Sequence, residues 1–264
     1  MRIVYIPVFL CLFSCNIISN NEEPPVVVKD TSSESVLVSV LKAHPDSLLA
    51  WENLIQFYRE NGDYPKALGT VATAIQKDSF SERLFYIRGT LQYENEDTVS
   101  AIKSFERAAY LKPTPENNLF LSTLYAETKD SRALTVADNL STYWKVAPEK
   151  VLFIKGIYYS AINDKMKAIR LMDECLRMNF TYMEAYREKA LALYDLHKYD
   201  DALQVLNKAV TLQNSYEEGY YYMGQCLEKL NRFPEAAEAY RKALMYDPGY
   251  VEAKEALEKI DKTK

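Results

Sequence analysis

Apolar residues recur along most of this chain at the spacing of one helical face. The clearest stretch is residues 217–250, where Tyr220, Gly224 and Leu227 are separated by four and three positions. That spacing places all three on the same side of a helix. A turn follows at residues 231–234, and a second apolar stripe comes after it, formed by Ala236, Tyr240 and Ala243. The pattern predicts a helix–turn–helix hairpin with one apolar seam.

The same pattern returns upstream with a period of about 34 residues, which is the signature of a repeat array. Residues 34–44 match the second half of the frame and predict a half-repeat, while residues 251–261 predict a helix that caps the last apolar face. The copy at 116–148 fits least well and is one residue shorter than the frame. The predicted repeats are residues 48–81, 82–115, 116–148, 149–182, 183–216 and 217–250.

The first full repeat carries the motif Trp51-x-x-Leu54-Ile55-x-x-Tyr58, with Ile55 where a glycine is usual. This motif, together with the unit at 217–250, resembles the tetratricopeptide repeat, whose signature has Trp, Leu-Gly, Tyr, Ala, Phe and Pro at fixed offsets. The resemblance extends from about residue 48 to the end of the chain. It implies an all-α, right-handed solenoid whose first helices line a concave groove that binds proteins or peptides.

The apolar seam uses positions 4, 7, 8 and 11 of each repeat, so helical geometry turns positions 2, 5, 9 and 12 toward the predicted groove. Exposed aromatic residues with arginine beside them are typical of protein-binding hot spots. The alternative is that these side chains pack against neighbouring helices. Arrays of this family that bind the C-terminal carboxylate of a peptide use Lys and Asn at positions 5 and 9 of the first helices. Here no Lys stands at position 5 and no Asn at position 9, which disfavours that type of array. The candidate groove residues are Arg59, Tyr86, Tyr93, Phe153, Ile157, Arg187, Tyr194, Tyr221 and Gln225.

The first residues of the chain have the character of a targeting segment. Arg2 precedes an apolar stretch at residues 3–13 that is too short to span a bilayer as a helix. The segment ends in Leu-Phe-Ser-Cys, which resembles a bacterial lipobox, although Phe13 stands where a small residue is usual. We therefore expect residues 1–14 to be a signal peptide and Cys15 to be lipidated. The alternative is an ordinary signal peptide that is cleaved elsewhere.

Residues 15–33 contain acidic residues and prolines without helical periodicity, so they predict a disordered tether before the solenoid at 34–264. The net charge of −5 argues against a nucleic-acid partner, because such proteins need a basic surface. The two histidines, His44 and His197, lie outside any metal-binding or catalytic motif. The sequence therefore predicts no enzyme activity, no cofactor, no metal and no small-molecule substrate.

These features together predict a lipid-anchored scaffold for protein–protein interaction in the bacterial cell envelope, at the outer membrane. Its partner would be a protein or a peptide held in the concave groove. The alternative is a non-catalytic subunit of a secretion, pilus or cell-wall enzyme complex, similar to the pilotin lipoproteins. The lipid anchor and the tether would hold the array near the membrane without being part of its fold.

Overall fold

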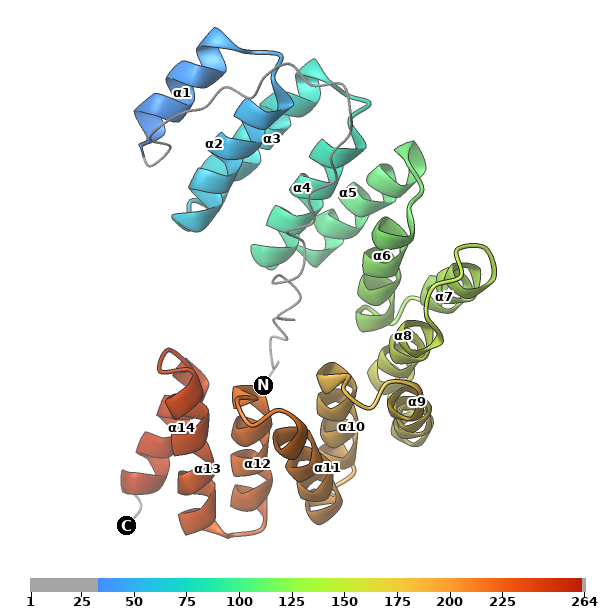
Figure 1. Cartoon of the computed structure of the whole chain (residues 1–264), viewed down its shortest axis with the longest axis vertical. Coiled ribbons are helices and arrows are strands. Elements are labelled where there is room, and N and C mark those ends of the chain that lie inside the picture. The colour runs from blue at the N-terminus through green and yellow to red at the C-terminus, as the bar shows by residue number, and fades with distance from the viewer. Residues whose placement is uncertain (1–32, 263–264) are drawn as a thin grey trace. The chain divides into compact units, whose positions relative to one another are not determined.

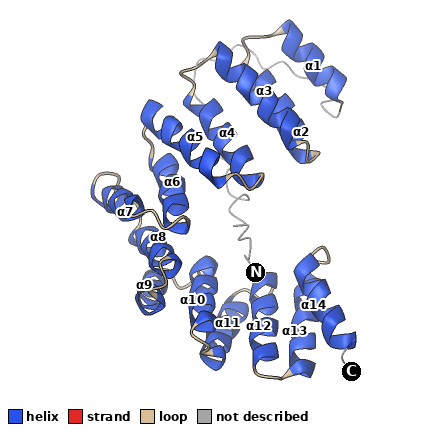
Figure 2. Ribbon diagram, turned by 180° about the vertical axis from the view of Figure 1, so that it is seen from behind, coloured by secondary structure: helices blue, strands red, loops and turns tan. Residues whose placement is uncertain are grey.

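A computed structural model describes residues 33–262 of the chain, and this part is entirely helical (Figures 1 and 2). The predicted signal peptide, Cys15 and all of the predicted tether except Ser33 lie outside the described residues. The helices are α1 Glu34–Ala43, α2 Leu48–Glu60, α3 Tyr64–Lys77, α4 Glu82–Glu94, α5 Thr98–Leu111, α6 Pro115–Glu127, α7 Arg132–Thr142, α8 Pro148–Ala161, α9 Lys165–Met178, α10 Met183–Asp195, α11 Tyr199–Leu212, α12 Glu217–Lys229, α13 Phe233–Tyr246 and α14 Val251–Lys262.

The helices form two compact units, which we call unit 1 and unit 2. Unit 1 ends at Pro113 and contains α1 to α5, whereas unit 2 begins at Thr114 and contains α6 to α14. Within each unit a helix packs mainly on the helices next to it in sequence, such as α8 on α9 and α12 on α13 (Figure 1). This order confirms the all-α array of hairpins, with the half-repeat α1 at its start and the capping helix α14 at its end.

Short polar side chains cap the start of six of the twelve hairpin helices α2 to α13. Ser47, Ser81 and Thr114 precede first helices, and the side-chain oxygen of each accepts a hydrogen bond from a backbone N–H in the first turn. Asp63 and Asp97 do the same before the second helices α3 and α5. Such caps satisfy amide groups that have no partner inside the helix. They fix the starting residue of the helix and therefore the face that each helix turns to its neighbours.

The turn between the two helices of every hairpin contains one residue with left-handed backbone geometry. These residues have φ between 59° and 70°, and only the first of them is a glycine. The left-handed conformation reverses the chain within three residues, or four between α6 and α7, so that the second helix can pack back on the first. The residues are Gly62, Glu96, Lys129, Asn163, His197 and Asn231.

The spacing of these turn residues shows where the repeat period changes. Successive turns are 34 residues apart, except that Glu96 and Lys129 are separated by 33. Because α6 begins at Pro115, the missing residue lies in the connection between α5 and α6, and the third hairpin keeps the usual distance from its start to its turn. The sequence frame instead placed the shortening inside 116–148. The connection that lost the residue is also the boundary between the two units.

In three hairpins the apolar seam pairs a glycine of the first helix with a large side chain of the second: Phe105, Met172 or Tyr240. In unit 2, Gly224 of α12 lies so close to the ring of Tyr240 on α13 that a β-carbon at this position would collide with the ring. In unit 1, Gly89 of α4 faces the ring of Phe105 on α5 in the same way. Tyr240 and Phe105 are both completely buried. In these two hairpins the close approach of the helices therefore depends on a glycine facing an aromatic ring across the seam.

Candidate interaction surface

The first helices of the hairpins carry the residues predicted to line a groove. We use "first-helix face" for the side of these helices that bears positions 2, 5, 6, 9 and 12 of the repeat. Three of the predicted residues, Arg59, Tyr86 and Tyr93, belong to unit 1. The other six belong to α8, α10 and α12 of unit 2, which are Phe153, Ile157, Arg187, Tyr194, Tyr221 and Gln225.

In unit 1 the first-helix face is held by polar and aromatic contacts between neighbouring helices. Arg59 of α2 forms a two-pronged ion pair with Glu94 of α4, with Nε to Oε2 at 2.7 Å. The ring of Tyr86 packs edge-on against Phe105, with centroids 5.3 Å apart. Tyr86 and Tyr93 are both half-buried. These side chains therefore fix the packing of α2, α4 and α5, and they leave only part of their surface for a partner.

Phe153 differs from the prediction because its side chain is only 4% exposed. It packs in a cluster with Met172, Cys175 and Ala185, and its ring centroid is 4.9 Å from that of Tyr182. The ring of Tyr182, in the loop before α10, covers the side of Phe153 that was expected to be open. Phe153 is thus a core residue, while Ile157 one turn later is half-buried against the same cluster.

Arg187 was expected at the surface, but the residue is only 7% exposed. Its Nε donates to Glu188 at 3.1 Å, and its Nη1 donates to Glu218 of α12 at 3.0 Å. Burial lowers the pKa of the guanidinium, but the two carboxylates outweigh this effect and raise it. Burial raises the pKa of Glu188, and Arg187 opposes that rise. Arg187, Glu188 and Glu218 thus form an ion-pair triad that links α10 to α12, in which one guanidinium is shared by two carboxylates.

Tyr194, Tyr221 and Gln225 are half-buried and lie on the first-helix face of α10 and α12. The amide of Gln225 donates to the Tyr221 hydroxyl oxygen at 2.7 Å. The Tyr194 ring packs edge-on against Tyr199, with centroids 5.1 Å apart, and burial raises the pKa of its hydroxyl to about 12. These three side chains keep exposed surface together with polar atoms, as a binding face requires.

Sequence reasoning missed several residues that belong to the same face. Tyr222 and Glu188 occupy position 6 of their repeats, a position outside the predicted groove stripe. Tyr250 lies in the loop before α14, and its ring centroid is 5.0 Å from that of Tyr221. Position 6 is next to position 5 in sequence and lies about 100° further round the helix, so a wider helical stripe would have included it. Tyr250 gave no such signal, because a loop residue has no helical face.

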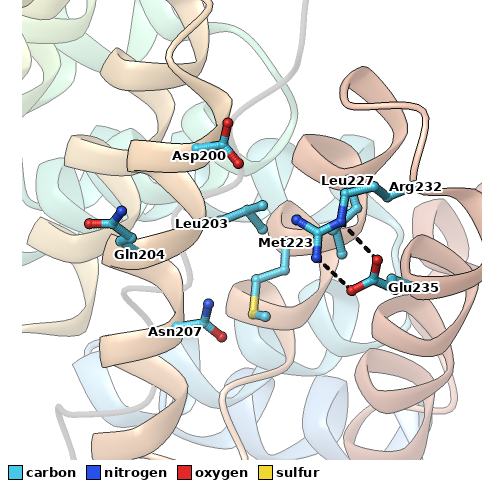
Figure 3. A pocket seen from close by; sticks show the side chains of 8 residues that line it. All are labelled: Asp200, Leu203, Gln204, Asn207, Met223, Leu227, Arg232 and Glu235. Carbon is cyan, nitrogen blue, oxygen red and sulfur yellow. Dashed lines mark hydrogen bonds and ion pairs between the residues drawn. The ribbon is translucent and has the colours of Figure 1, made fainter.

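A pocket of about 320 Å³ lies outside this face, between α11 and the α12–α13 hairpin (Figure 3). Leu203, Met223 and Leu227 provide its apolar lining. Arg232 and Glu235 stand at its edge and are joined by two hydrogen bonds of 2.8 and 2.6 Å. The pair closes the turn between α12 and α13, so its groups are already engaged with each other. The pocket contains none of the residues predicted from the sequence.

Two further observations concern chemistry and membranes. Within residues 33–262, no three His, Cys, Asp or Glu side chains come together in a way that could hold a metal ion. Among the helices of the same range, none combines the length and apolar character needed to cross a bilayer.

Comparison with family models identifies the class of protein. Two models described as tetratricopeptide repeat match this chain, one over residues 217–250 and the other over 32–82, 58–118 and 155–217. Together these matches cover more than half of the sequence. The chain therefore belongs to the tetratricopeptide repeat family, whose fold is typical of scaffolds for protein–protein interaction. A comparison with curated proteins gave no match.

Solved structures share the fold at low sequence identity. A tetratricopeptide repeat protein from Parabacteroides merdae ATCC 43184 aligns with a TM-score of 0.72 and 17% identity, covering 86% of this chain and 91% of that one. The type IV pilus biogenesis factor PilW aligns with a TM-score of 0.59 and 17% identity, covering 78% and 96%. A thermophilic tetratricopeptide repeat protein from Thermus thermophilus gives 0.57 and 19%, covering 68% and 98%. At these identities the likeness concerns the fold alone.

Proposed function

We propose that this protein is a membrane-anchored scaffold, lipidated at Cys15, that binds a partner protein on the first-helix face of its repeats during assembly of the cell envelope. The tetratricopeptide fold supports the scaffold part of this proposal, because its first helices present side chains from several repeats on one face. The lipobox-like end of the signal sequence supports the anchor. The proposal assigns no catalytic role to any residue.

One observation carries the binding part of the proposal: Tyr221 and Gln225 form a preorganised polar pair on α12. Gln225 Nε2 donates to Tyr221 Oη, which leaves the Tyr221 hydroxyl hydrogen and the Gln225 amide oxygen without further partners among the described residues. The Tyr221 hydroxyl can donate to a backbone carbonyl of a peptide, and the Gln225 amide oxygen can accept from a backbone N–H. Because the pair is half-buried, a partner would exclude water from these bonds and strengthen them.

We expect Gln225→Ala combined with Tyr221→Phe to weaken partner binding about tenfold while leaving helical content unchanged. The double variant removes the free donor and the amide but keeps the aromatic ring that packs on Tyr240 and Tyr250. The loss of two net hydrogen bonds corresponds to roughly 1–3 kcal/mol of binding free energy. The measurement is quantitative pull-down from detergent-solubilised membranes, with circular dichroism and a thermal melt to monitor the fold.

A matched control is Tyr110→Ala, which removes an aromatic side chain that is 78% exposed on the second helix α5. This variant should retain every partner. If the α12 double variant keeps its melt and also keeps every wild-type partner at wild-type affinity, the first-helix face of α12 is not the binding site and the proposal is wrong in that part.

The anchor is tested separately at Cys15. We expect the wild-type protein to incorporate labelled palmitate in bacterial cells and to sediment with membranes, and the Cys15→Ala variant to incorporate none. The reason is that an acylated cysteine with two or more chains holds a protein on a bilayer far more firmly than a single chain. The control is Cys11→Ala, which lies inside the predicted signal peptide and should not affect labelling. Absence of label from the wild-type protein would remove the anchor from the proposal.

A further inference from the structure

We propose that one edge of unit 2 lies on the surface of the membrane, with exposed apolar side chains from the loops between repeats entering the lipid headgroup region. We use "connection edge" for the side of the unit where one repeat is joined to the next, and "turn edge" for the opposite side, which bears the turns inside the hairpins. The inference rests on the proposed function, because the lipid anchor at Cys15 would bring the chain to a bilayer.

The two edges follow from the antiparallel packing of successive helices, which sends all connections to one end of the helices and all hairpin turns to the other. In both views of unit 2 the connections α9–α10, α11–α12 and α13–α14 lie on one side, and the α12–α13 turn lies on the opposite side (Figures 1 and 2). Large apolar side chains are exposed mainly on the connection edge. Among the described residues of unit 2, those at least 60% exposed all lie there, and they are Tyr143, Met178, Phe180, Met245 and Val251. On the turn edge the most exposed is Met166, at 50%.

The α9–α10 connection holds its aromatic side chain outward on a fixed backbone. The carbonyl of Phe180 accepts a hydrogen bond from the Tyr186 hydroxyl at 3.1 Å. Next to it, Asn179 Oδ1 accepts a hydrogen bond from the backbone N–H of Thr181, with the nitrogen 3.1 Å away. Such side-chain bonds to the following backbone are typical of well-defined turns. The Phe180 ring is therefore 61% exposed on a well-defined turn, as a side chain that enters a lipid surface requires.

The kinds of side chain on the connection edge are those found where a membrane meets water. The α7–α8 connection presents Tyr143, Trp144 and Lys145 in succession, all of them exposed. At the end of α9, Arg177 precedes Met178, and the arginine side chain is 75% exposed. Tyrosine and tryptophan place an apolar ring in the lipid and a polar tip among the headgroups, while lysine and arginine extend their charges toward water. The connection edge thus combines apolar rings and cations within the same connections.

Net charge does not drive this contact. Acidic residues stand in the first turns of α8, α10 and α12, so the connection edge bears charges of both signs. One further carboxylate, that of Asp247 in the α13–α14 connection, accepts a hydrogen bond from the backbone N–H of Gly249 at 2.9 Å and is thereby turned toward its own loop. The contact therefore depends on apolar burial, and we expect it on uncharged lipid as well as on anionic lipid.

The distribution of these side chains favours a lipid surface over a protein partner. They come from separate loops that are one or two repeats apart in sequence, as Tyr143, Phe180 and Met245 do. A protein hot spot gathers its anchors at the centre of one packed patch, whereas a bilayer accepts single side chains independently. Each insertion is weak by itself, but a lipid anchor makes it an intramolecular event with a high effective concentration. Residues 15–33 could extend to at most about 65 Å, which keeps the array close to the bilayer.

The first test compares the two ends of α9 in the full chain. Phe180→Cys places a thiol on the connection edge, and Ile162→Cys places one on the turn edge. The native Cys175 and Cys226 are buried, so a nitrobenzoxadiazole fluorophore reacts with the introduced thiol. The labelled, lipidated chain is reconstituted into phosphatidylcholine vesicles that contain a lipid with a doxyl quencher. We expect quenching about fivefold stronger at position 180 than at 162, because a helix of this length separates its ends by roughly 20 Å. Equal quenching at the two positions, or stronger quenching at 162, would overturn the inference.

Two matched triple variants identify the side chains that make the contact. The first should reduce quenching at position 180 about threefold, because it removes apolar surface from the connection edge, and it combines Tyr143→Ser, Met245→Ser and Val251→Ser. The control removes apolar surface from the turn edge and should leave that quenching unchanged, and it combines Ile162→Ser, Met166→Ser and Phe233→Ser. All six side chains are exposed, so helical circular dichroism should not change. An equal effect of the two variants, or no effect of either, contradicts the inference.

Palmitate labelling of the same preparations separates this inference from the proposed function. If the wild-type chain takes up label but positions 180 and 162 are quenched alike, the anchor stands and the membrane contact of unit 2 is wrong. If the wild-type chain takes up no label, the anchor fails and the inference fails with it. Loss of a protein partner from the connection-edge variant, with position 180 unquenched in the chain that keeps its apolar side chains, would assign this edge to a protein contact and would also reject the inference.

Discussion

Replacing Tyr240 with alanine is expected to lower the free energy of unfolding by about 3–5 kcal/mol, the range measured for deleting large buried aromatic side chains. Tyr240 is completely buried, and its ring lies against the α-carbon of Gly224 on the partner helix of the hairpin. The hydroxyl donates to Glu228 of α12, so the side chain joins α12 to α13 through both packing and a hydrogen bond. The measurement is urea denaturation of the full chain followed by circular dichroism.

Two further variants separate the contributions of the ring and the hydroxyl. Tyr240→Phe keeps the ring and should cost about 1.5–3 kcal/mol, since the hydroxyl bonds to a charged group. Gly224→Ala adds a methyl group against a rigid ring and should also destabilise, whereas Gly156→Ala should cost less because the atom it meets is the flexible end of Met172. A loss below about 1 kcal/mol for Tyr240→Ala would mean that the ring does not close the α12–α13 seam.

Replacing Arg187 with alanine should destabilise the protein by about 3–5 kcal/mol at pH 7, because removing one partner of a buried ion pair leaves the other charge without compensation. The change removes the cation between Glu188 and Glu218 and leaves both carboxylates in a poorly solvated site. The structural role explains why a residue predicted to contact a partner is instead 7% exposed. Urea denaturation of variant and wild type at several pH values measures the effect.

The pH dependence has a definite sign. Burial raises the pKa of Glu188 in the folded protein even when Arg187 is present, and removal of Arg187 takes away the group that opposes the rise. A carboxyl whose folded pKa is raised destabilises the fold above that pKa, and its penalty disappears below the unfolded value of about 4.3. The deficit of Arg187→Ala should therefore shrink as pH falls from 7 toward 4. A deficit that grows on acidification would contradict the assigned ion pair. Lys208→Ala, at an exposed position on α11, serves as a control that should show neither effect.

The repeat architecture could be predicted from the sequence because its signal is redundant. The two residues of the pairs Gly224–Tyr240 and Gly89–Phe105 are the same distance apart in sequence, so each of the two repeats supports the assignment of the other. The shortened period was also visible, but its position was not. Pro113 and Thr114 belong to a connection without apolar periodicity, so the sequence contained no mark of which side had lost the residue. The backbone angles of Glu96 and Lys129 were needed to locate it.

The interaction surface was harder to predict, because helical position fixes the direction of a side chain and not what covers it. Phe153 and Tyr221 occupy the same position of their repeats, yet Tyr182 packs over Phe153 while Tyr221 remains half-exposed. Arg187 shares that position too, and its burial depends on Glu218 from the next repeat. Contacts of this kind join residues about one repeat apart, and a single sequence does not show which of the possible neighbours are in contact.

The left-handed turn residues also bear on how such a gene can change length. Asn163, His197 and Asn231 are 34 residues apart and share one backbone conformation, with φ of 69°, 60° and 59°. Recombination between two copies of the coding sequence at equivalent turns would remove or add one repeat length, that is, two helices, and would still join a first helix to a second helix through the same kind of turn. Loss of residues 163–196, for instance, would connect Ile162 to His197 and leave a complete turn between α8 and α11. The turns are thus the places where evolution can shorten or lengthen this array without breaking a helix.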